Sequence, residues 1–121
     1  MEAKIRQIIL DTETSGLDYE KDRIIEVGCL ELIDGIFSGK KFHKYYRPEA
    51  VIISAEAEAI HGLNNVFLSK FPSFDEDIED FYKFIDTSEL IIHNAQFDLT
   101  MINNSLKRTS KPLIKREFVT C

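Results

Sequence analysis

Two carboxylates, Asp11 and Glu13, stand two positions apart directly after a short apolar run, residues 5–10. Successive side chains of a β-strand point to opposite faces of the sheet, so both carboxylates are expected on one face. Neighbouring carboxylates repel each other unless a cation lies between them or one of them is protonated. A hard divalent ion such as Mg²⁺ is the simplest partner for the pair. The spacing alone fits equally well two loop carboxylates that cap a turn before Gly16.

A third carboxylate, Asp98, follows a second short apolar run, residues 89–92. Apolar residues at helical spacing come after it, which predicts that Asp98 lies in the first turn of a helix directly after a strand: Leu99, Ile102 and Leu106. The helix dipole favours negative charge there, so stabilisation of the helix is an alternative role. Carboxylates at the C-terminal ends of neighbouring strands occupy a usual place for a site in α/β folds. Phosphoryl transfer with two metal ions needs such a carboxylate cluster.

The elements around these carboxylates predict an α/β domain with a mixed sheet. Apolar runs indicate strands at about 5–10, 23–33 and 36–46, and the hairpin signal Asp34-Gly35 joins the last two. Residues 11–16 are expected to form a loop after the first strand. An antiparallel meander of three strands is therefore followed by alternating strands and helices, which suggests parallel pairing.

Two helices are expected between the meander and the strand at 89–92. Ser54 is a candidate N-cap of a short helix through about residue 60, which Gly62 closes. Ser73 and Glu76 have the spacing of a capping box and predict that a longer helix opens at residues 72–73. Its apolar stripe recurs at helical steps: Phe74, Ile78, Phe81 and Ile85. This helix is expected to pack on the sheet.

Length and composition fit one globular domain, residues 1–121, because the chain has 121 residues of which 44% are hydrophobic. The sequence contains neither a membrane-spanning apolar run nor the apolar core of a signal peptide, which predicts a cytoplasmic protein without a membrane partner. Cys29 and Cys121 have neither metal-site spacing nor a disulfide pattern. A net charge of −6 argues against binding nucleic acid by bulk electrostatics, although acidic sites loaded with cations become locally positive.

The segments around the three carboxylates carry a family resemblance. Residues 11–17, Asp-Thr-Glu-Thr-Ser-Gly-Leu, and residues 92–98, Ile-His-Asn-Ala-Gln-Phe-Asp, resemble the first and second motifs of the DEDD-type 3′→5′ exonucleases, which have a ribonuclease H-like fold. Residues 23–28 and 60–63 resemble connecting motifs, and the likeness covers essentially the whole chain. Within this family the sequence is most similar to the epsilon (proofreading) subunits of bacterial DNA polymerase III.

The resemblance implies the roles of individual residues. Asp11, Glu13 and Asp98 would be catalytic and would bind two divalent cations, Mg²⁺ or Mn²⁺. Asp11 and Glu13 would also contact the 3′-terminal nucleotide, together with a further set: Thr12, Thr14, Glu56, His61 and Asn94. The substrate would be a single-stranded or frayed 3′ end of DNA, and the partner would be the catalytic subunit of a replicative DNA polymerase. Without the family, His61 is better explained as a histidine at a helix C-terminus. Phe97 is better explained as a core residue than as a platform on which a base stacks.

The third motif of the family is absent from the chain. That motif, a histidine followed five positions later by an aspartate, supplies the general base and the fourth carboxylate. Of the three histidines, His43, His61 and His93, only His93 has an aspartate at that distance, and this aspartate belongs to the second motif. The strand expected at 117–121 also has nothing to complete it, so we expect the N-terminal two-thirds of an exonuclease domain, a C-terminally incomplete fold. The loss of a general base costs ~10²–10⁴-fold in rate, so these residues alone are expected to be nearly inactive.

Two other functions remain open from the sequence. The same two motifs occur in RNA-directed 3′→5′ exonucleases of the oligoribonuclease and ribonuclease T groups. A non-catalytic nucleic-acid-binding module that keeps the fold is the alternative from a different class. The retention of three mutually repelling carboxylates argues against that module, and the missing third motif argues for it.

Overall fold

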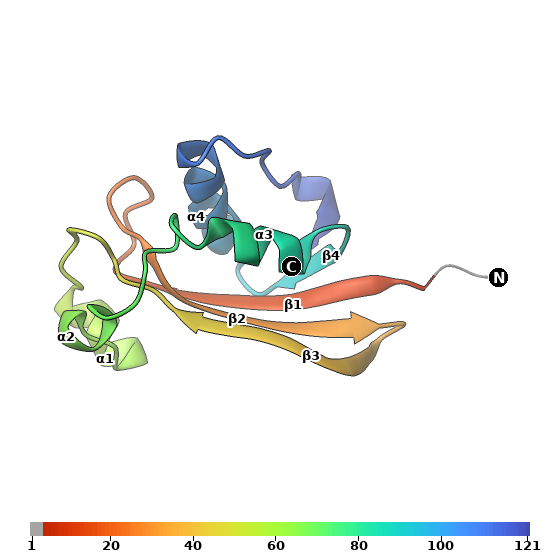
Figure 1. The fold of residues 1–121 in the computed structure, drawn as a ribbon, viewed down its shortest axis with the longest axis horizontal. Coiled ribbons are helices and arrows are strands. Elements are labelled where there is room, and N and C mark those ends of the chain that lie inside the picture. Colours follow the sequence, from red (N-terminus) through yellow and green to blue (C-terminus); the bar gives the residue numbers. More distant parts are fainter. Residues whose placement is uncertain (1–3) are drawn as a thin grey trace.

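The sheet has five strands in the order β3-β2-β1-β4-β5, and the computed structural model describes it within residues 4–121 (Figure 1). The pairs β1–β2 and β2–β3 are antiparallel, whereas β4 is parallel to β1 and β5 is parallel to β4. The predicted α/β fold, a meander followed by parallel strands, is therefore confirmed. The strands are β1 (Arg6–Thr14), β2 (Ile24–Ile33), β3 (Ile36–Tyr45), β4 (Glu89–Ile92) and β5 (Val119–Thr120).

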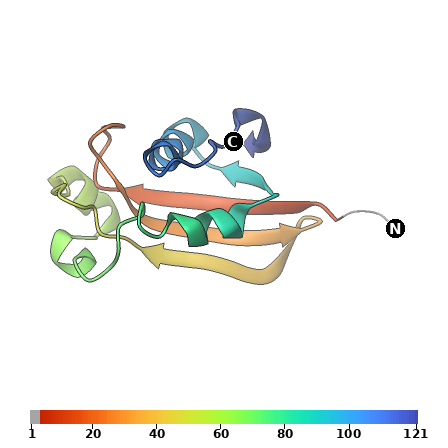
Figure 2. The same cartoon turned by 45° about the horizontal axis from the view of Figure 1, so that its top comes forward.

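Two helices cover one face of this sheet, and two shorter ones lie at the end where β1 finishes (Figure 2). Those on the face are α3 (Ile78–Ile85) and α4 (Ala95–Arg108), and those at the end are α1 (Ala55–His61) and α2 (Asn65–Leu68). The main core lies between the sheet and α3 and α4, and includes Ile8, Leu10, Val27, Phe81 and Ile102. On the opposite face of the sheet, Ile9 and Leu30 are 39% and 41% exposed. Among residues 4–121, no helix has the length and apolar character needed to cross a bilayer.

Strand β1 is longer than predicted. Its pairing with β2 continues through Asp11↔Gly28 and Glu13↔Glu26, so residues 11–14 belong to the strand and not to a loop. The prediction was wrong because β2 offers a continuous main-chain partner, which outweighs the weak strand preference of polar residues. Both carboxylates are consequently fixed by a regular ladder.

A β-bulge ends this ladder and creates a second small core. The register moves from Glu13↔Glu26 to Thr14↔Ile24, which leaves Ile25 without a partner on β1. Ile25 is completely buried, and it packs with Ile53 and Leu68 beneath α1 and α2. An extra residue of this kind bends a strand and redirects a side chain. The bulge therefore positions α1 and α2 beside the end of β1.

The ends of α1 agree with the prediction, whereas the start of α3 does not. The Ser54 hydroxyl accepts a hydrogen bond from the Ala57 N–H at 3.1 Å, and Gly62 ends α1 with a φ of 75°. The bonds of the predicted capping box, Ser73 with Glu76, are both present at 3.2 Å. They close a turn, however, and α3 begins only at residue 78, because Ser73 is held in a β-bridge to the segment after β3. The predicted apolar stripe is buried throughout: Phe74, Ile78, Phe81 and Ile85.

Three other elements also test the sequence predictions. Strand β4 has the predicted bounds, and Asp98 lies in the first turn of α4 as expected. The strand predicted at 117–121 is only two residues long, because a 3-10 helix, Arg116–Phe118, takes up its beginning. Helix α2 was not predicted, since its four residues are too few to show a helical period.

Candidate active site

A cavity of about 830 Å³ lies at the C-terminal ends of β1 and β4, between the loop after β1, the start of α4 and helix α1. All the site residues predicted from the sequence line it: Asp11, Thr12, Glu13, Thr14, Glu56, His61, Asn94 and Asp98. They come from β1, α1 and the start of α4, which are far apart in the sequence. The fold therefore brings one candidate set into one place.

Strand β1 sorts its polar residues between the two faces of the sheet. Thr12 and Thr14 alternate with the two carboxylates and are each only 8% exposed. Asp11 and Glu13 share the other face, where Glu26 of β2 is the direct cross-strand neighbour of Glu13. Burial raises the pKa of Glu13, and the negative charges of Asp11 and Glu26 raise it further. This face of the sheet is thus rich in negative charge at the end of β1.

Asp98 is the most buried of the three carboxylates, at 6% exposed. The Thr12 hydroxyl donates a hydrogen bond to its Oδ1 at 2.8 Å, which links α4 to β1. Burial raises the pKa of Asp98 to about 6, and the charges of Asp11 and Glu13 add to the increase. The hydroxyl of Thr12 acts in the opposite direction, because it stabilises the charged form. The charge of His93 acts in the same direction as Thr12, but the two together do not offset burial and the two negative charges, so the pKa of Asp98 stays raised.

The donor atoms suit a hard divalent cation, although the side chains do not yet surround one. Among residues 4–121, no three His, Cys, Asp or Glu side chains converge closely enough to hold a metal ion. Carboxylate oxygens are nevertheless the ligands that Mg²⁺ prefers. A cation would stabilise the charged form of Asp98, which burial and the repulsion from Asp11 and Glu13 both disfavour. The residues present therefore fit a divalent metal by their chemistry and charge.

His61 has both ring nitrogens engaged. The Leu63 N–H donates to Nδ1 at 3.0 Å, so the proton of the neutral ring lies on Nε2. Nε2 lies 3.3 Å from the carbonyl oxygen of Thr14, to which it donates. His61 thereby ties the end of α1 to the end of β1. Glu56, on the same helix, is exposed on the wall of the cavity.

The cavity also has lining residues that were not predicted. Three large aliphatic side chains on its wall are more than four-fifths exposed: Leu17, Ile52 and Ile60. Asp18, Lys21, Asp22 and His93 line it as well. Phe97, expected in the core, packs half-buried against the main core and also lines the cavity, with its ring centroid 5.5 Å from that of Tyr19. Leu17, His93 and Phe97 belong to the two motifs, whereas no sequence signal indicated that the others line the cavity.

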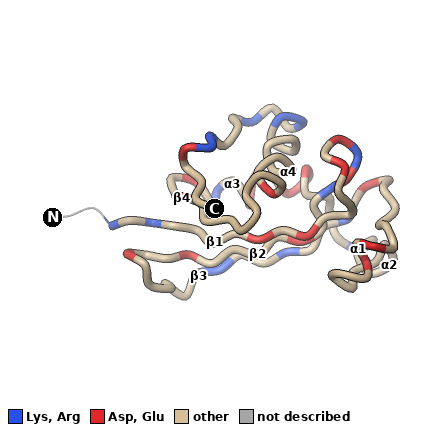
Figure 3. Tube along the Cα trace, turned by 180° about the vertical axis from the view of Figure 1, so that it is seen from behind, with Lys and Arg blue, Asp and Glu red and all other residues tan. Residues whose placement is uncertain are grey.

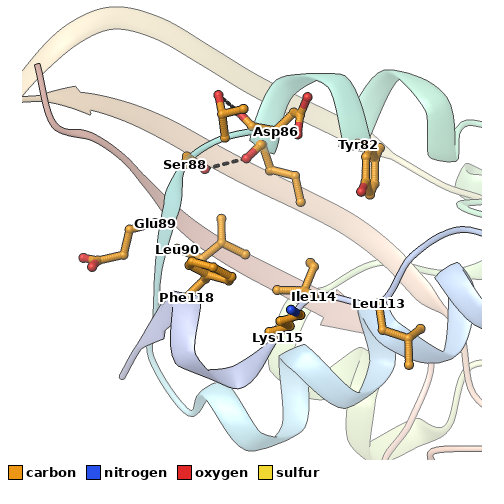
Figure 4. A pocket seen from close by; sticks show the side chains of 11 residues that line it. Tyr82, Asp86, Ser88, Glu89, Leu90, Leu113, Ile114, Lys115 and Phe118 are labelled. Atoms are coloured by element: carbon orange, nitrogen blue, oxygen red, sulfur yellow. Dashed lines mark hydrogen bonds between the residues drawn. The ribbon is translucent and has the colours of Figure 1, made fainter. Parts of the chain in front are cut away.

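Charged positions of both signs occur over the rest of the chain. Acidic positions are frequent at the end of β1 and on α1, the loop after β1 carries both signs, and basic positions lie on β3 and after α4 (Figure 3). A second cavity, of about 470 Å³, lies at the other end of β4, between the turn after α3 and residues 113–118 (Figure 4). It contains none of the predicted site residues. Cys29 is buried, and burial raises its pKa to about 12, so its thiol is not a nucleophile at neutral pH.

Comparison with known proteins identifies a matching family and several relatives. A family described as "Exonuclease" (RNase_T) matches residues 8–120. The chain is 45% identical over 113 residues to the DNA polymerase III subunit epsilon of Buchnera aphidicola subsp. Schizaphis graminum, covering 89% of this chain and 48% of that protein. It is 40% identical over 118 residues to the subunit of the same name from Escherichia coli K12, covering 93% and 46%. The chain thus spans about half the length of the curated relatives it matches.

Solved structures agree on the fold. A crystal structure of exonuclease I in complex with the inhibitor BCBP superposes with a TM-score of 0.85 at 14% identity, covering 98% of this chain and 28% of that one. E. coli exonuclease I in complex with a dT13 oligonucleotide gives a TM-score of 0.81 at 16% identity, covering 88% and 24%. At such low identity these structures support the ribonuclease H-like architecture alone.

Proposed function

The chain belongs to the Exonuclease (RNase_T) family, and on this premise we propose that it carries part of the active site of a metal-dependent 3′→5′ exonuclease that proofreads DNA. The substrate is the single-stranded or frayed 3′ end of DNA, and the working partner is the catalytic subunit of a replicative DNA polymerase. Association with that polymerase would place the protein in the cytoplasm. The observation that carries the proposal is the single cavity lined by all eight predicted residues.

The three carboxylates and Thr12 would have different chemical roles. Asp11, Glu13 and Asp98 would hold divalent cations, Mg²⁺ or Mn²⁺, which in phosphodiester hydrolysis activate the attacking water and neutralise the leaving oxygen. Thr12 would keep Asp98 ionised and oriented, since its hydroxyl already donates to Oδ1 at 2.8 Å. The sheet pairing fixes the main chain at Asp11 and Glu13, so little backbone freedom has to be lost when the ligands assemble.

The residues of α1 and of the α4 N-cap would hold the terminal nucleotide. The Nε2–H of His61 is 3.3 Å from the Thr14 carbonyl, a long hydrogen bond that a ribose or phosphate oxygen could replace. Glu56 stands exposed on the same wall and can accept a hydrogen bond from a 3′-hydroxyl. Asn94 adopts a left-handed conformation, φ 57° and ψ 50°, and its side chain does not cap α4, which leaves its amide free for a ligand.

His61 does not replace the general base of the missing third motif. Its Nδ1 accepts from a main-chain N–H and its Nε2 carries the proton, so neither nitrogen is available to take a proton from water. Residues 1–121 would accordingly form the N-terminal two-thirds of an exonuclease domain, with the first and second motifs but not the third. On this proposal the 121 residues alone hydrolyse DNA very slowly.

The test is the release of nucleotides from a 3′-labelled single-stranded DNA oligomer with Mn²⁺. The proteins compared are this chain, the natural polypeptide wherever it extends beyond Cys121, and the Asp11→Ala variant of each. Glu58→Gln is a matched control for Glu56→Gln, because both lie on α1 but only Glu56 lines the cavity. We expect release by the extended protein alone, lost in Asp11→Ala, weakened in Glu56→Gln and retained in Glu58→Gln.

The same assay distinguishes the alternatives. Faster release from an RNA of the same sequence would favour an oligoribonuclease or ribonuclease T type of activity. Binding of DNA without release by any extended form would favour the non-catalytic module. Release that persists in Asp11→Ala would contradict the proposed role of the β1 carboxylates.

A further inference from the structure

The loop between β1 and β2 forms one wall of the active-site cavity and is held by a buried aspartate. Residues 16–18, Lys21 and Asp22 line the cavity. The carboxylate of Asp22 is 7% exposed and has two hydrogen-bond donors within the loop. The Ser15 hydroxyl donates to Oδ1 at 2.8 Å, and the Asp18 N–H donates to Oδ2 at 2.9 Å. Asp22 therefore closes the loop on itself.

Ser15 connects this carboxylate to the rest of the site. Its hydroxyl also accepts from the Arg23 N–H at 2.9 Å, and its own N–H donates to the Arg23 carbonyl at 2.9 Å. Its carbonyl accepts from the N–H of Ser54, the N-cap of α1, at 3.2 Å. Ser15 is only 1% exposed. The pair Ser15 and Asp22 thus joins the end of β1, the loop and the beginning of the helix that carries Glu56 and His61.

Three more contacts make the loop a fixed wall. A Cβ on Gly16 would lie 2.5 Å from Oδ2 of Asp22, so the carboxylate occupies the space that any other residue at position 16 would need. On the far side, Asn104 of α4 donates to the carbonyl of Tyr19 at 2.7 Å, and the ring of Tyr19 packs on Phe97. The loop is consequently tied both to β1 and to α4, the two elements that carry the carboxylates.

We propose that Asp22 is a positioning residue which, through Ser15, fixes the loop of residues 16–22 as a preformed wall against the nucleotide and thereby sets the affinity for a single-stranded 3′ end. This inference rests on the proposed function, because it assumes that the cavity receives a nucleotide. It assigns Asp22 no contact with the reacting phosphate. A preformed wall raises affinity because the loop loses no conformational entropy on binding.

The experiment measures binding of the whole chain to fluorescein-labelled (dT)10 by anisotropy with Ca²⁺, and Mn²⁺ affinity by calorimetry. Asp22→Asn is compared with Glu20→Gln, which removes the same charge from an exposed position in the same loop that does not line the cavity. We expect Asp22→Asn to raise the Kd for (dT)10 about tenfold, the size of one lost charge-assisted hydrogen bond. Glu20→Gln should change it less than twofold, and Mn²⁺ affinity should stay the same in both.

The sign of the effect separates positioning from simple electrostatics. Removal of a negative charge from the cavity favours a polyanion, so electrostatics alone predicts tighter binding by Asp22→Asn. Tighter or unchanged binding by the folded variant would overturn the proposal, and so would an equal loss of Mn²⁺ affinity, which indicates general damage. If Asp22→Asn does not fold, Ser15→Ala keeps the charge and should raise the Kd about threefold; an unchanged Kd contradicts the proposal. Absence of (dT)10 binding by the unsubstituted chain would overturn the proposed function as well, whereas binding without these effects overturns the role of Asp22 alone.

Discussion

Replacing Asp98 by Asn should stabilise the metal-free protein at neutral pH. Asn has nearly the same shape as Asp, and its Oδ1 can still accept the 2.8 Å hydrogen bond from the Thr12 hydroxyl. The substitution therefore removes the charge of a buried carboxylate and leaves its main contact in place. Burial and two neighbouring carboxylates oppose that charge, so its removal is favourable when no cation is bound.

The size and the sign of the effect follow from the pKa of Asp98. That pKa is about 6 in the folded protein against 3.8 for an ordinary aspartate, and each unit corresponds to about 1.4 kcal/mol. The folded state holds the proton more tightly than the unfolded state, so ionisation of Asp98 above pH 6 costs up to about 3 kcal/mol of folding free energy. The cost decreases as the pH falls from 6 to 4 and disappears below the unfolded pKa. Asp98→Asn should therefore gain up to about 3 kcal/mol at pH 8, roughly 10 °C in Tm, and nothing at pH 3.5.

Urea unfolding in EDTA, from pH 3.5 to pH 8, measures this difference directly. Asp86→Asn is the matched control, because the side chain of Asp86 is exposed and outside the active-site cavity. Its free energy of unfolding should follow that of the unsubstituted chain at every pH. Addition of Mn²⁺ should stabilise the unsubstituted chain and leave Asp98→Asn unchanged. Destabilisation by Asp98→Asn at pH 8, or a difference that does not vary with pH, would refute the reasoning.

Three smaller substitutions test other parts of the site. Thr12→Val removes the hydroxyl that opposes protonation of Asp98, so it should raise the pKa of Asp98 further, seen by NMR titration, and cost about 1 kcal/mol of stability. Gly16→Ala places a Cβ 2.5 Å from the carboxylate of Asp22 and should cost about 1–3 kcal/mol in urea unfolding, because the loop must shift. Ser54→Ala removes the N-cap bond of α1 and should lower the free energy of unfolding by about 1 kcal/mol. Helical circular dichroism should decrease, but by less than complete unfolding of α1 would cause.

The sequence predicted the features of the site that depend on local geometry. Asp11 and Glu13 share a face because a strand repeats every two residues, and the ladder with β2 preserves that repeat. Asp98 lies in the first turn of α4 because apolar spacing of three and four residues follows it directly. These placements require only neighbouring residues, so a single sequence contains the information for them.

The sequence did not predict the features that depend on contacts between distant segments. Residues 11–14 extend β1 because β2 pairs with them, and polar composition alone had indicated a loop. The bond from Thr12 to Asp98 joins residues 86 positions apart, and the exposed rim residue Ile52 has no motif to identify it. The bulge that places Ile25 in the second small core also arises from the pairing of β1 with β2. In each case a distant partner segment determines the local structure, and the local sequence pattern does not identify that partner.

The site lies where the fold can tolerate an unfavourable charge cluster. Strand β1 is paired on both sides, with β2 along its whole length and with β4 along residues 7–10, and Ile8 and Leu10 are buried in the main core. The carboxylates begin at the next residue, where the pairing with β4 stops and the cavity opens. A cost of about 3 kcal/mol at Asp98 is a large part of the 5–15 kcal/mol that stabilises a typical domain, so it requires strong pairing directly beside it. Most of this cost comes from burial of the charge, and repulsion from Asp11 and Glu13 adds to it. A bound cation would offset both, so carboxylates that are costly to folding would still favour metal binding.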